Sequence, residues 1–461
     1  MLEQWFKLRE NRTTVGTEVV AGLTTFMVMA YIIFVNPAIL SFAGIKDLAG
    51  QGPPFAPTLA ATCLVAGVMT AAMGLVANYP FAIASGMGLN AVVAFQLIAS
   101  LRLPWPAAMG VIFLEGVAIT ILVLTGFRQA VMEAIPLSLK RAIGVGIGLF
   151  ILFIGLFSSG LVKPGPSGVP VTLGDFTSIP LLVTMIGLFL TIWLMAQKVR
   201  GALLLGIVVT TIIAIILNAA TGWKAWSIPG VAVLPEKVFA LPDFSTLGRG
   251  INFQVFAHLG LLSALLTIFA IMLSDFFDTM GTVIGIGGEA GFLDREGRLP
   301  RLDRVLLVDS LAAVFGGAAS ASSATTYIES AAGVSEGGRT GLTSVVTALC
   351  FFAALFFAPI AGIVPPQATA PALIIVGYLM CTLVKEIPFS DFEEGLPALM
   401  TLAVMPFTYS ITNGIGAGFI IYTFLKLVRG KGREVHWMMY VASAAFALYF
   451  ALPWLKQTFG F

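Results

Sequence analysis

The sequence predicts an all-α polytopic membrane protein, and three observations carry that prediction. Of its 461 residues, 58% are hydrophobic and only 10% are charged, whereas soluble domains carry about 25% charged residues. Apolar runs of about 20 residues recur along the chain, the length of helix that crosses roughly 30 Å of hydrocarbon. Lys and Arg residues gather in alternate loops between these runs. Together these features predict about fourteen membrane-spanning helices.

The predicted spans fall into two sets of equal size. The first set covers residues 16–36, 56–77, 82–100, 105–126, 137–160, 178–197 and 202–219. The second set covers residues 255–284, 303–319, 326–337, 341–363, 369–385, 393–411 and 413–428. A loop with several prolines separates the two sets. The last apolar segment, residues 437–452, is short, and the sequence leaves open whether it crosses the membrane or lies at the interface.

The basic residues predict the orientation of the chain. If the N-terminus is cytoplasmic, the loops on that side receive the large majority of Lys and Arg, as the positive-inside rule requires. The charged N-terminal stretch precedes a full-length span rather than a short apolar region, so we expect no removable signal peptide. We therefore expect a multi-pass protein of the plasma membrane with its N-terminus in the cytoplasm.

An odd number of spans in each half makes the second half enter the membrane from the opposite side, which predicts an inverted repeat. Two stretches of small residues support this organisation. PFAIASGMGLNA (80–91) and GGAASASSATTYIES (316–330) both occur at the third span of their half. Interrupted segments at matching positions are the best sequence pointer to a transporter's binding site.

Residues 271–288 (IMLSDFFDTMGTVIGIGG) place two carboxylates inside an apolar run. Acidic side chains at membrane depth are rare and usually functional. The threonines and glycines after Asp278 predict a break in the helix beside it, where irregular backbone lines a cavity. Burial disfavours the charged form of a carboxyl group, so Asp278 is a candidate to bind a proton or a ligand N–H. Asp275, one turn earlier on the same face, is a second candidate for proton coupling. For both residues the alternative is a structural carboxyl that a neighbouring group satisfies.

Further candidates accompany the two interrupted spans. Glu329 lies in the first turn of span ten, where it either faces a ligand or caps its own helix. If it faces the ligand, it is a candidate for proton coupling as well as for substrate binding. Asn90 holds the matching place in span three, and its amide can both donate and accept hydrogen bonds. Gly88 allows close backbone approach. The remaining candidates for ligand contact are Thr279, Thr326 and Tyr31, of which Tyr31 can also be a core residue.

Other intramembrane acids are expected to be structural. Glu18 and Glu115 are expected to be helix-packing or interfacial groups, and Asp309 is expected to help hold the start of span ten. No Lys or Arg lies well inside a span, which disfavours a site for a small inorganic anion. A neutral, hydrogen-bonding substrate carried with H⁺ or Na⁺ fits these acids better.

Several function classes are excluded by composition. With two histidines, and three cysteines that lack metal-ligand spacing, no metal site is expected. No pair of nucleophile and base suggests an enzyme, and no cofactor is expected beyond the coupling ion. The net charge of +2 is carried by loops and does not indicate nucleic-acid binding.

The chain resembles the adenine/guanine/hypoxanthine permeases, the AzgA-like branch of the nucleobase–cation symporter-2 family, which is related to the nucleobase–ascorbate transporters. The resemblance rests on six motifs in order over nearly the whole chain: TTFMVMAYIIFVNPAIL (24–40), GMGLNA (86–91), IPLSLKRAIGVGIGLFI (135–151), SDFFDTMGTVIG (274–285), TTYIESAAGVSEGGRTGL (325–342) and PFTYSITNGIGAGFI (406–420).

The resemblance implies fourteen spans in a seven-plus-seven inverted repeat, with short β-strands in spans three and ten. It divides the chain into a core domain and a gate domain. The expected boundaries are 13–126 and 255–363 for the core, 127–220 and 364–430 for the gate, 221–254 for the connecting loop and 431–461 for a C-terminal segment.

The resemblance also implies a proton symporter that imports purine bases by alternating access, through an elevator or a rocking movement, with a homodimer formed through the gate domain. Asp278, Glu329, Gly88 and Asn90 match the family's site positions. Three alternatives remain: an anion transporter on the same fold, a uracil or xanthine transporter, and a passive channel. Substrate accumulation against a gradient separates any of the transporters from the channel.

Overall fold

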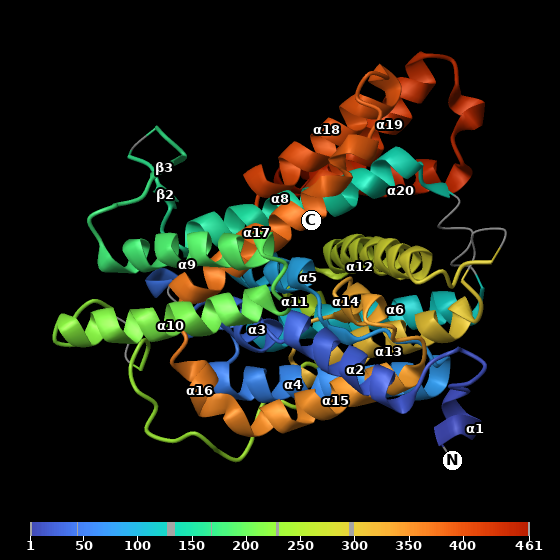
Figure 1. Ribbon diagram of the computed structural model, residues 1–461. Coiled ribbons are helices and arrows are strands. Elements are labelled where there is room, and N and C mark those ends of the chain that lie inside the picture. The colour runs from blue at the N-terminus through green and yellow to red at the C-terminus, as the bar shows by residue number, and fades with distance from the viewer. Residues whose placement is uncertain are drawn as a thin grey trace.

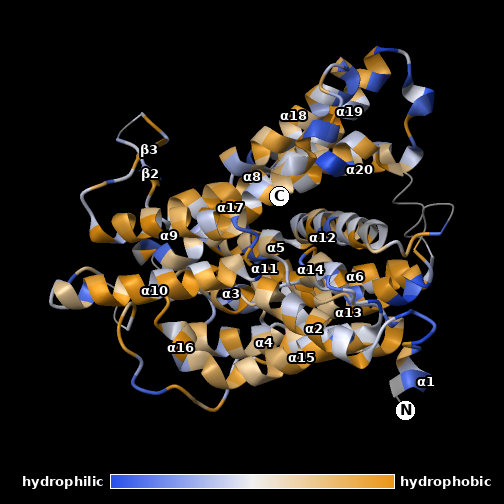
Figure 2. Ribbon diagram, viewed as in Figure 1, coloured by the Kyte–Doolittle hydropathy of each residue, from blue (hydrophilic) through white to orange (hydrophobic). Residues whose placement is uncertain are grey.

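The computed structural model describes residues 2–43, 45–126, 134–166, 168–226, 230–294 and 299–459, and this part of the chain is predominantly helical. Ten of its helices are long and apolar enough to cross a membrane. Hydrophobic residues cover most of their length, and hydrophilic residues gather at their ends and in the loops (Figure 2). The predicted class, a helical membrane protein, is therefore confirmed.

The helices of the first half follow the predicted spans within a few residues. After the short α1 (Leu2–Phe6), the elements are α2 (Val15–Met29), α3 (Ile32–Leu40), η1 (Lys46–Leu48), α4 (Phe55–Ala72), η2 (Met73–Ala77), β1 (Ile83–Ser85), α5 (Met87–Ala91), η3 (Val92–Ser100), α6 (Trp105–Leu124), α8 (Leu137–Ser158), the strands β2 (Val162–Pro164) and β3 (Val171–Leu173), α9 (Ile179–Ala196) and α10 (Ala202–Ala220).

The second half follows the prediction equally closely. Its elements are α11 (Val255–Leu259), α12 (Leu261–Glu289), α13 (Leu302–Ala319), β4 (Ala324–Thr326), α14 (Ser330–Ser335), α15 (Gly341–Ala354), η4 (Leu355–Phe357), α16 (Ala358–Gly362), α17 (Pro366–Cys381), η5 (Thr382–Glu386), α18 (Phe392–Phe407), α19 (Ile411–Val428), η6 (Gly432–Glu434) and α20 (Trp437–Phe459). The last helix extends beyond the predicted 437–452, because it continues past the apolar segment.

The predicted break beside Asp278 is wrong. Helix α12 runs without interruption from Leu261 to Glu289, through both aspartates and the glycines that follow them. A backbone in hydrocarbon must satisfy its polar groups internally, so a helix is retained even where glycine would weaken it in water. Irregular backbone occurs instead in spans three and ten.

Those two spans contain a short antiparallel pair of strands. Residue Ile83 of β1 pairs with Thr326 of β4, and Ser85 pairs with Ala324. The turn before β4 is tight, since a Cβ on Gly316 would lie 2.2 Å from the Ser322 carbonyl oxygen. Ser322 itself has a φ of 69°, a left-handed conformation that non-glycine residues rarely adopt. The strands expected from the resemblance are thus present, and all six of their residues are buried.

The long helices form two groups with α12 and α5 between them (Figure 1). One group holds α2, α4, α6, α13 and α15, which pack on one another; the other holds α8, α17, α18 and α19. Buried hydrophobic side chains connect the groups, with Tyr31, Phe276 and Tyr327 in the same cluster as Ile147 and Ile411. The strand pair and the acidic part of α12 therefore lie near the seam between the two groups.

Candidate functional site

The β1–β4 pair places the starts of two short helices at its opposite ends. Helix α5 follows β1 and α14 follows β4, and the strands are antiparallel. Hydrogen bonds extend the ribbon beyond the strands: the Gly86 N–H donates to the Ser323 carbonyl at 2.8 Å, and the Tyr327 N–H donates to the Ala82 carbonyl at 2.9 Å. The Tyr327 hydroxyl donates to the Ser85 carbonyl at 2.5 Å. Both interrupted spans are thus held as one unit.

Asp309 of α13 anchors this unit to α12. Its Oδ1 accepts hydrogen bonds from the backbone N–H and the hydroxyl of Thr326, at 2.8 and 2.7 Å. Its Oδ2 accepts from the Thr279 hydroxyl at 2.7 Å. The expectation that Asp309 holds the start of span ten is confirmed. The hydroxyls of Thr279 and Thr326, predicted to contact a ligand, are bonded to Asp309 in this structure.

Glu329 is engaged across the fold rather than with its own helix. It occupies the N-cap position of α14, but its side chain makes no capping hydrogen bond there. Instead its Oε1 accepts a hydrogen bond of 2.5 Å from the hydroxyl of Tyr31, a fully buried residue at the start of α3. The capping alternative is therefore wrong for Glu329. Glu329 as a whole residue is only partly buried.

Asp278 of α12 completes an acidic group around Glu329. Its side chain is likewise only partly buried. The carboxyl groups of Asp309 and Glu329 interact electrostatically with that of Asp278. Tyr327, at the end of β4, interacts with the charges of both Asp278 and Glu329. The structure thus brings Asp278, Glu329 and Tyr31, three of the predicted site residues, into one neighbourhood.

Span three contributes a buried amide without a partner. Asn90 of α5 is fully buried, and neither its Nδ2 nor its Oδ1 forms a hydrogen bond. Helix α5 packs against three helices. These are α3, which directly follows Tyr31, α8, which carries Ile147, and α12, which carries Asp278. Gly88 allows this contact, because a Cβ there would lie 2.7 Å from Cγ2 of Ile147. Buried amides in folded proteins nearly always have partners, so Asn90 remains a candidate contact for a ligand.

Glu115, which the sequence predicts to be a helix-packing or interfacial group, lies in the interior of the protein. This residue of α6 is completely buried, and its carboxyl lies against Asp275 of α12 and Ser323, just before β4. Asp275 is also buried, at 2% exposure. An acid in the middle of an apolar helix is the one sequence signal that points to such a group; its neighbours follow only from the tertiary structure.

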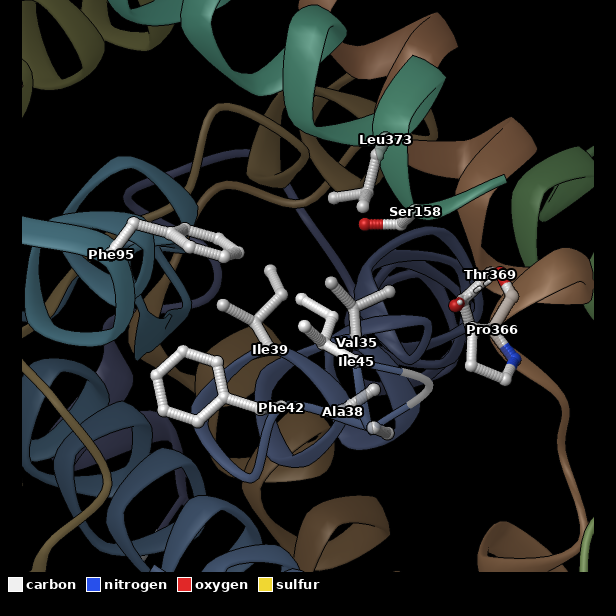
Figure 3. Close-up of a pocket in the computed structure, with 11 residues that line it drawn as sticks. Val35, Ala38, Ile39, Phe42, Ile45, Phe95, Ser158, Pro366, Thr369 and Leu373 are labelled. Carbon is white, nitrogen blue, oxygen red and sulfur yellow. Dashed lines mark hydrogen bonds between the residues drawn. The ribbon is translucent and has the colours of Figure 1, made fainter. Parts of the chain in front are cut away.

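A separate apolar pocket lies along the same seam (Figure 3). It is lined by the C-terminal part of α3 and the residues after it, by Phe95 of η3, by the end of α8 and by the start of α17. Val35, Ile39 and Leu373 point into it, and among the described residues that line it the hydroxyl groups belong to Ser158 and Thr369. The pocket contains none of the predicted site residues, and it offers few hydrogen bonds to a polar substrate.

A helical membrane protein with two interrupted spans that meet as a strand pair, and with carboxyl groups beside them, has the organisation of a secondary transporter. The solved transmembrane domain of the cyanobacterial bicarbonate transporter BicA has the same fold. It matches with a TM-score of 0.62 and 16% identity, over 87% of this chain and 97% of that chain.

The chain belongs to the Permease family (Xan_ur_permease), whose family model matches residues 16–450. The adenine permease AdeP of Escherichia coli strain K12 is 40% identical over 450 residues, which cover 97% of this chain and 95% of that protein. The guanine/hypoxanthine permease PbuG of Bacillus subtilis strain 168 is 38% identical over 459 residues, which cover 97% and 99% of the two chains. The resemblance found in the sequence is thus confirmed, and the protein is a membrane transporter rather than an enzyme.

Proposed function

We propose that this protein imports purine nucleobases (adenine, guanine or hypoxanthine) together with protons. The proposal is supported by AdeP and PbuG, relatives over almost the full length that are named as purine permeases. It is also supported by the chemistry of the site. Asp278 and Glu329 offer acceptors for the N–H groups of a base, and the Asn90 amide offers a donor and an acceptor.

The observation that carries the proposal is the unpartnered amide of Asn90, which is buried in α5, a helix that packs against both α3 and α12. The edge of a purine presents donors and acceptors side by side, which is what an amide needs to satisfy both of its polar atoms. Tyr31 and Tyr327 supply aromatic surface next to the acids, suited to a planar ring. An inorganic anion would instead be repelled by Asp278 and Glu329.

Transport follows by alternating access, in which a core moves against a gate. In this proposal the core comprises residues 13–126 and 255–363, and the gate comprises 127–220 and 364–430, of which 127–133 lie outside the described residues. Helix packing supports this division. In the gate α8 packs against α17 and α18, whereas in the core α6 packs against α13 and α2 packs against α15. The connecting loop is 221–254, and residues 431–461 form a C-terminal segment.

The remaining parts of the topology are proposed on the same basis. Fourteen spans form a seven-plus-seven inverted repeat, with β1 and β4 at matching places in the two halves. The N-terminus faces the cytoplasm, and the protein resides in the plasma membrane, as the basic loops and the bacterial relatives support. Two copies associate through the gate domain.

The test is uptake of radiolabelled hypoxanthine into proteoliposomes, with and without an inward proton gradient. We expect accumulation that depends on the gradient and that unlabelled adenine or guanine reduces, while uracil and sulfate leave it unchanged. Replacing the proton gradient with a sodium gradient separates H⁺ from Na⁺ coupling.

Two results would contradict the proposal. If the protein transported sulfate or uracil but not hypoxanthine, it would be a transporter of another substrate class. Equilibration of hypoxanthine without accumulation, whichever gradient is applied, would indicate a channel.

A further inference from the structure

Two buried carboxyl groups lie against one another with a single hydroxyl donor, that of Ser323, beside them. Glu115 of α6 is 0% exposed, and neither of its oxygens accepts a hydrogen bond. Its carboxyl lies against Asp275 of α12. Asp275 accepts one hydrogen bond at Oδ2, from the Ser323 hydroxyl at 2.9 Å, whereas its Oδ1 has no partner. The hydroxyl of Ser323 has a single hydrogen, so that hydrogen is not available to Glu115.

Two ionised carboxylates cannot remain buried side by side without donors, because both desolvation and their mutual repulsion disfavour the charges. One proton held between them removes one of the charges and supplies the missing hydrogen bond. We propose that Glu115 and Asp275 together bind the proton that is transported with the substrate. This inference rests on the proposed function, and it assigns the proton to a pair that lies apart from the partly exposed Asp278 and Glu329.

The surroundings favour a proton over a metal cation. The charged groups that act on the pair are acidic: Asp309 of α13 and Asp278, one turn along α12. In the part of the chain that the structure describes, no cluster of three or more His, Cys, Asp or Glu side chains is arranged to hold a metal ion. A sodium ion needs several oxygen ligands, whereas a proton needs only two of the three carboxyl oxygens that lack partners.

The structure also connects this pair to the substrate site. Ser323, which donates to Asp275, accepts a hydrogen bond at its carbonyl oxygen from the N–H of Gly86. Gly86 is the N-cap residue of α5, which carries Asn90. On its other side Ser323 immediately precedes β4, which leads to Glu329. A change in the protonation of Asp275 therefore acts directly on the β1–β4 strand pair, whose flanking residues lead to Asn90 and Glu329. In this way proton binding and substrate binding become linked.

The experiment uses proteoliposomes of the full chain with a pH-sensitive dye inside. Hypoxanthine added outside should acidify the lumen in the wild type. In Glu115→Gln we expect this proton movement to fall by at least roughly tenfold, while counterflow, in which labelled hypoxanthine exchanges for internal unlabelled hypoxanthine, stays near the wild-type rate. The amide keeps the size of the side chain but cannot bind the proton.

Glu18→Gln is the matched control, because Glu18 is another fully buried glutamate of a membrane helix, with its carboxyl already satisfied by donors. It should retain both proton movement and counterflow per folded molecule. If Glu115→Gln moved as many protons per transported hypoxanthine as the wild type does, the inference would be overturned. The absence of hypoxanthine transport in the wild type would instead overturn the proposed function beneath it.

A second variant keeps the test decisive if Glu115→Gln does not fold. Asp275→Asn removes the other carboxyl and retains an acceptor for Ser323, so it should show the same loss of proton movement with counterflow preserved. Size-exclusion profiles identify the folded variants. Proton movement at the wild-type level in folded Asp275→Asn would count against the pair as firmly as the first result.

Discussion

Two glutamates of this protein are equally buried and differ completely in their surroundings. Glu18 of α2 accepts hydrogen bonds from the N–H of Arg339 at 2.9 Å and from the hydroxyls of Thr340 and Thr343 at 2.9 and 2.6 Å. Glu115 of α6 accepts none. The first carboxylate holds the N-terminal end of α15 against α2. The second is one of the two carboxyl groups to which we assign the transported proton.

The comparison shows that burial by itself does not indicate the role of an intramembrane acid. A buried carboxyl group with several donors has its hydrogen bonds satisfied and contributes to the fold, as one does at a helix N-terminus. A buried carboxyl without donors changes its protonation instead. The same distinction separates Asp309, whose oxygens bind Thr279 and Thr326, from the partly exposed Asp278. Function is expected where the donors are missing.

Loss of the Asp278 carboxylate should have the largest effect on transport. We predict that Asp278→Asn abolishes uphill uptake, so that the ratio of hypoxanthine inside to outside falls to about one. Asp278 lies between the bound base and the proton-binding Asp275, with which it interacts electrostatically, so its loss separates substrate binding from proton binding, and transport without coupling reaches equilibrium only. Proteoliposome uptake under an inward proton gradient measures this ratio, and thermal melting confirms that the protein is folded. Accumulation at the wild-type level would remove Asp278 from the coupling mechanism.

Loss of the Glu18 carboxylate should affect stability without affecting coupling. Glu18→Ala leaves the hydroxyls of Thr340 and Thr343 and the backbone N–H of Arg339 without their acceptor. We expect the free energy of unfolding to fall by about 3 kcal/mol, seen as a lower melting temperature in detergent. Glu115→Gln should melt close to the wild type. If Glu18→Ala were as stable as the wild type, the contrast between the two glutamates would lose its physical basis.

Changes at the Tyr31–Glu329 hydrogen bond should have a smaller and graded effect. Glu329→Ala removes an acceptor for the purine, and we expect it to weaken binding by roughly tenfold, the equivalent of about 1.4 kcal/mol. Tyr31→Phe removes only the hydroxyl that positions Glu329, so its effect should be a few-fold at most. Calorimetric titration with hypoxanthine measures both. Equal affinity in the wild type and in Glu329→Ala would leave this carboxyl a structural group.

Much of this architecture follows from the sequence. Hydropathy places the spans within a few residues, because the apolar length of a helix is set by the bilayer. The small residues at 80–91 and 316–330 correctly mark the interrupted spans, which pair as β1 and β4. The acids Asp278 and Glu329 follow from their rarity at membrane depth.

The rest depends on tertiary contacts that no sequence pattern encodes. The glycines after Asp278 predict a helix break, but α12 continues through them, because hydrocarbon penalises an open backbone more than it penalises glycine. Glu18 and Glu115 look alike in the sequence, and only the side chains that pack around them separate a satisfied carboxylate from an unsatisfied one. The bonds from Thr279 and Thr326 to Asp309 likewise become visible only in the folded structure.

The central claim is that the β1–β4 ribbon and α12 form the substrate site, and a structure of the protein with hypoxanthine bound tests it most directly. We predict the base between Asp278 and Glu329, with the Asn90 amide hydrogen-bonded to its edge. A base bound in the apolar pocket between α3 and α17 (Figure 3), with Asn90 still unpartnered, would contradict the account.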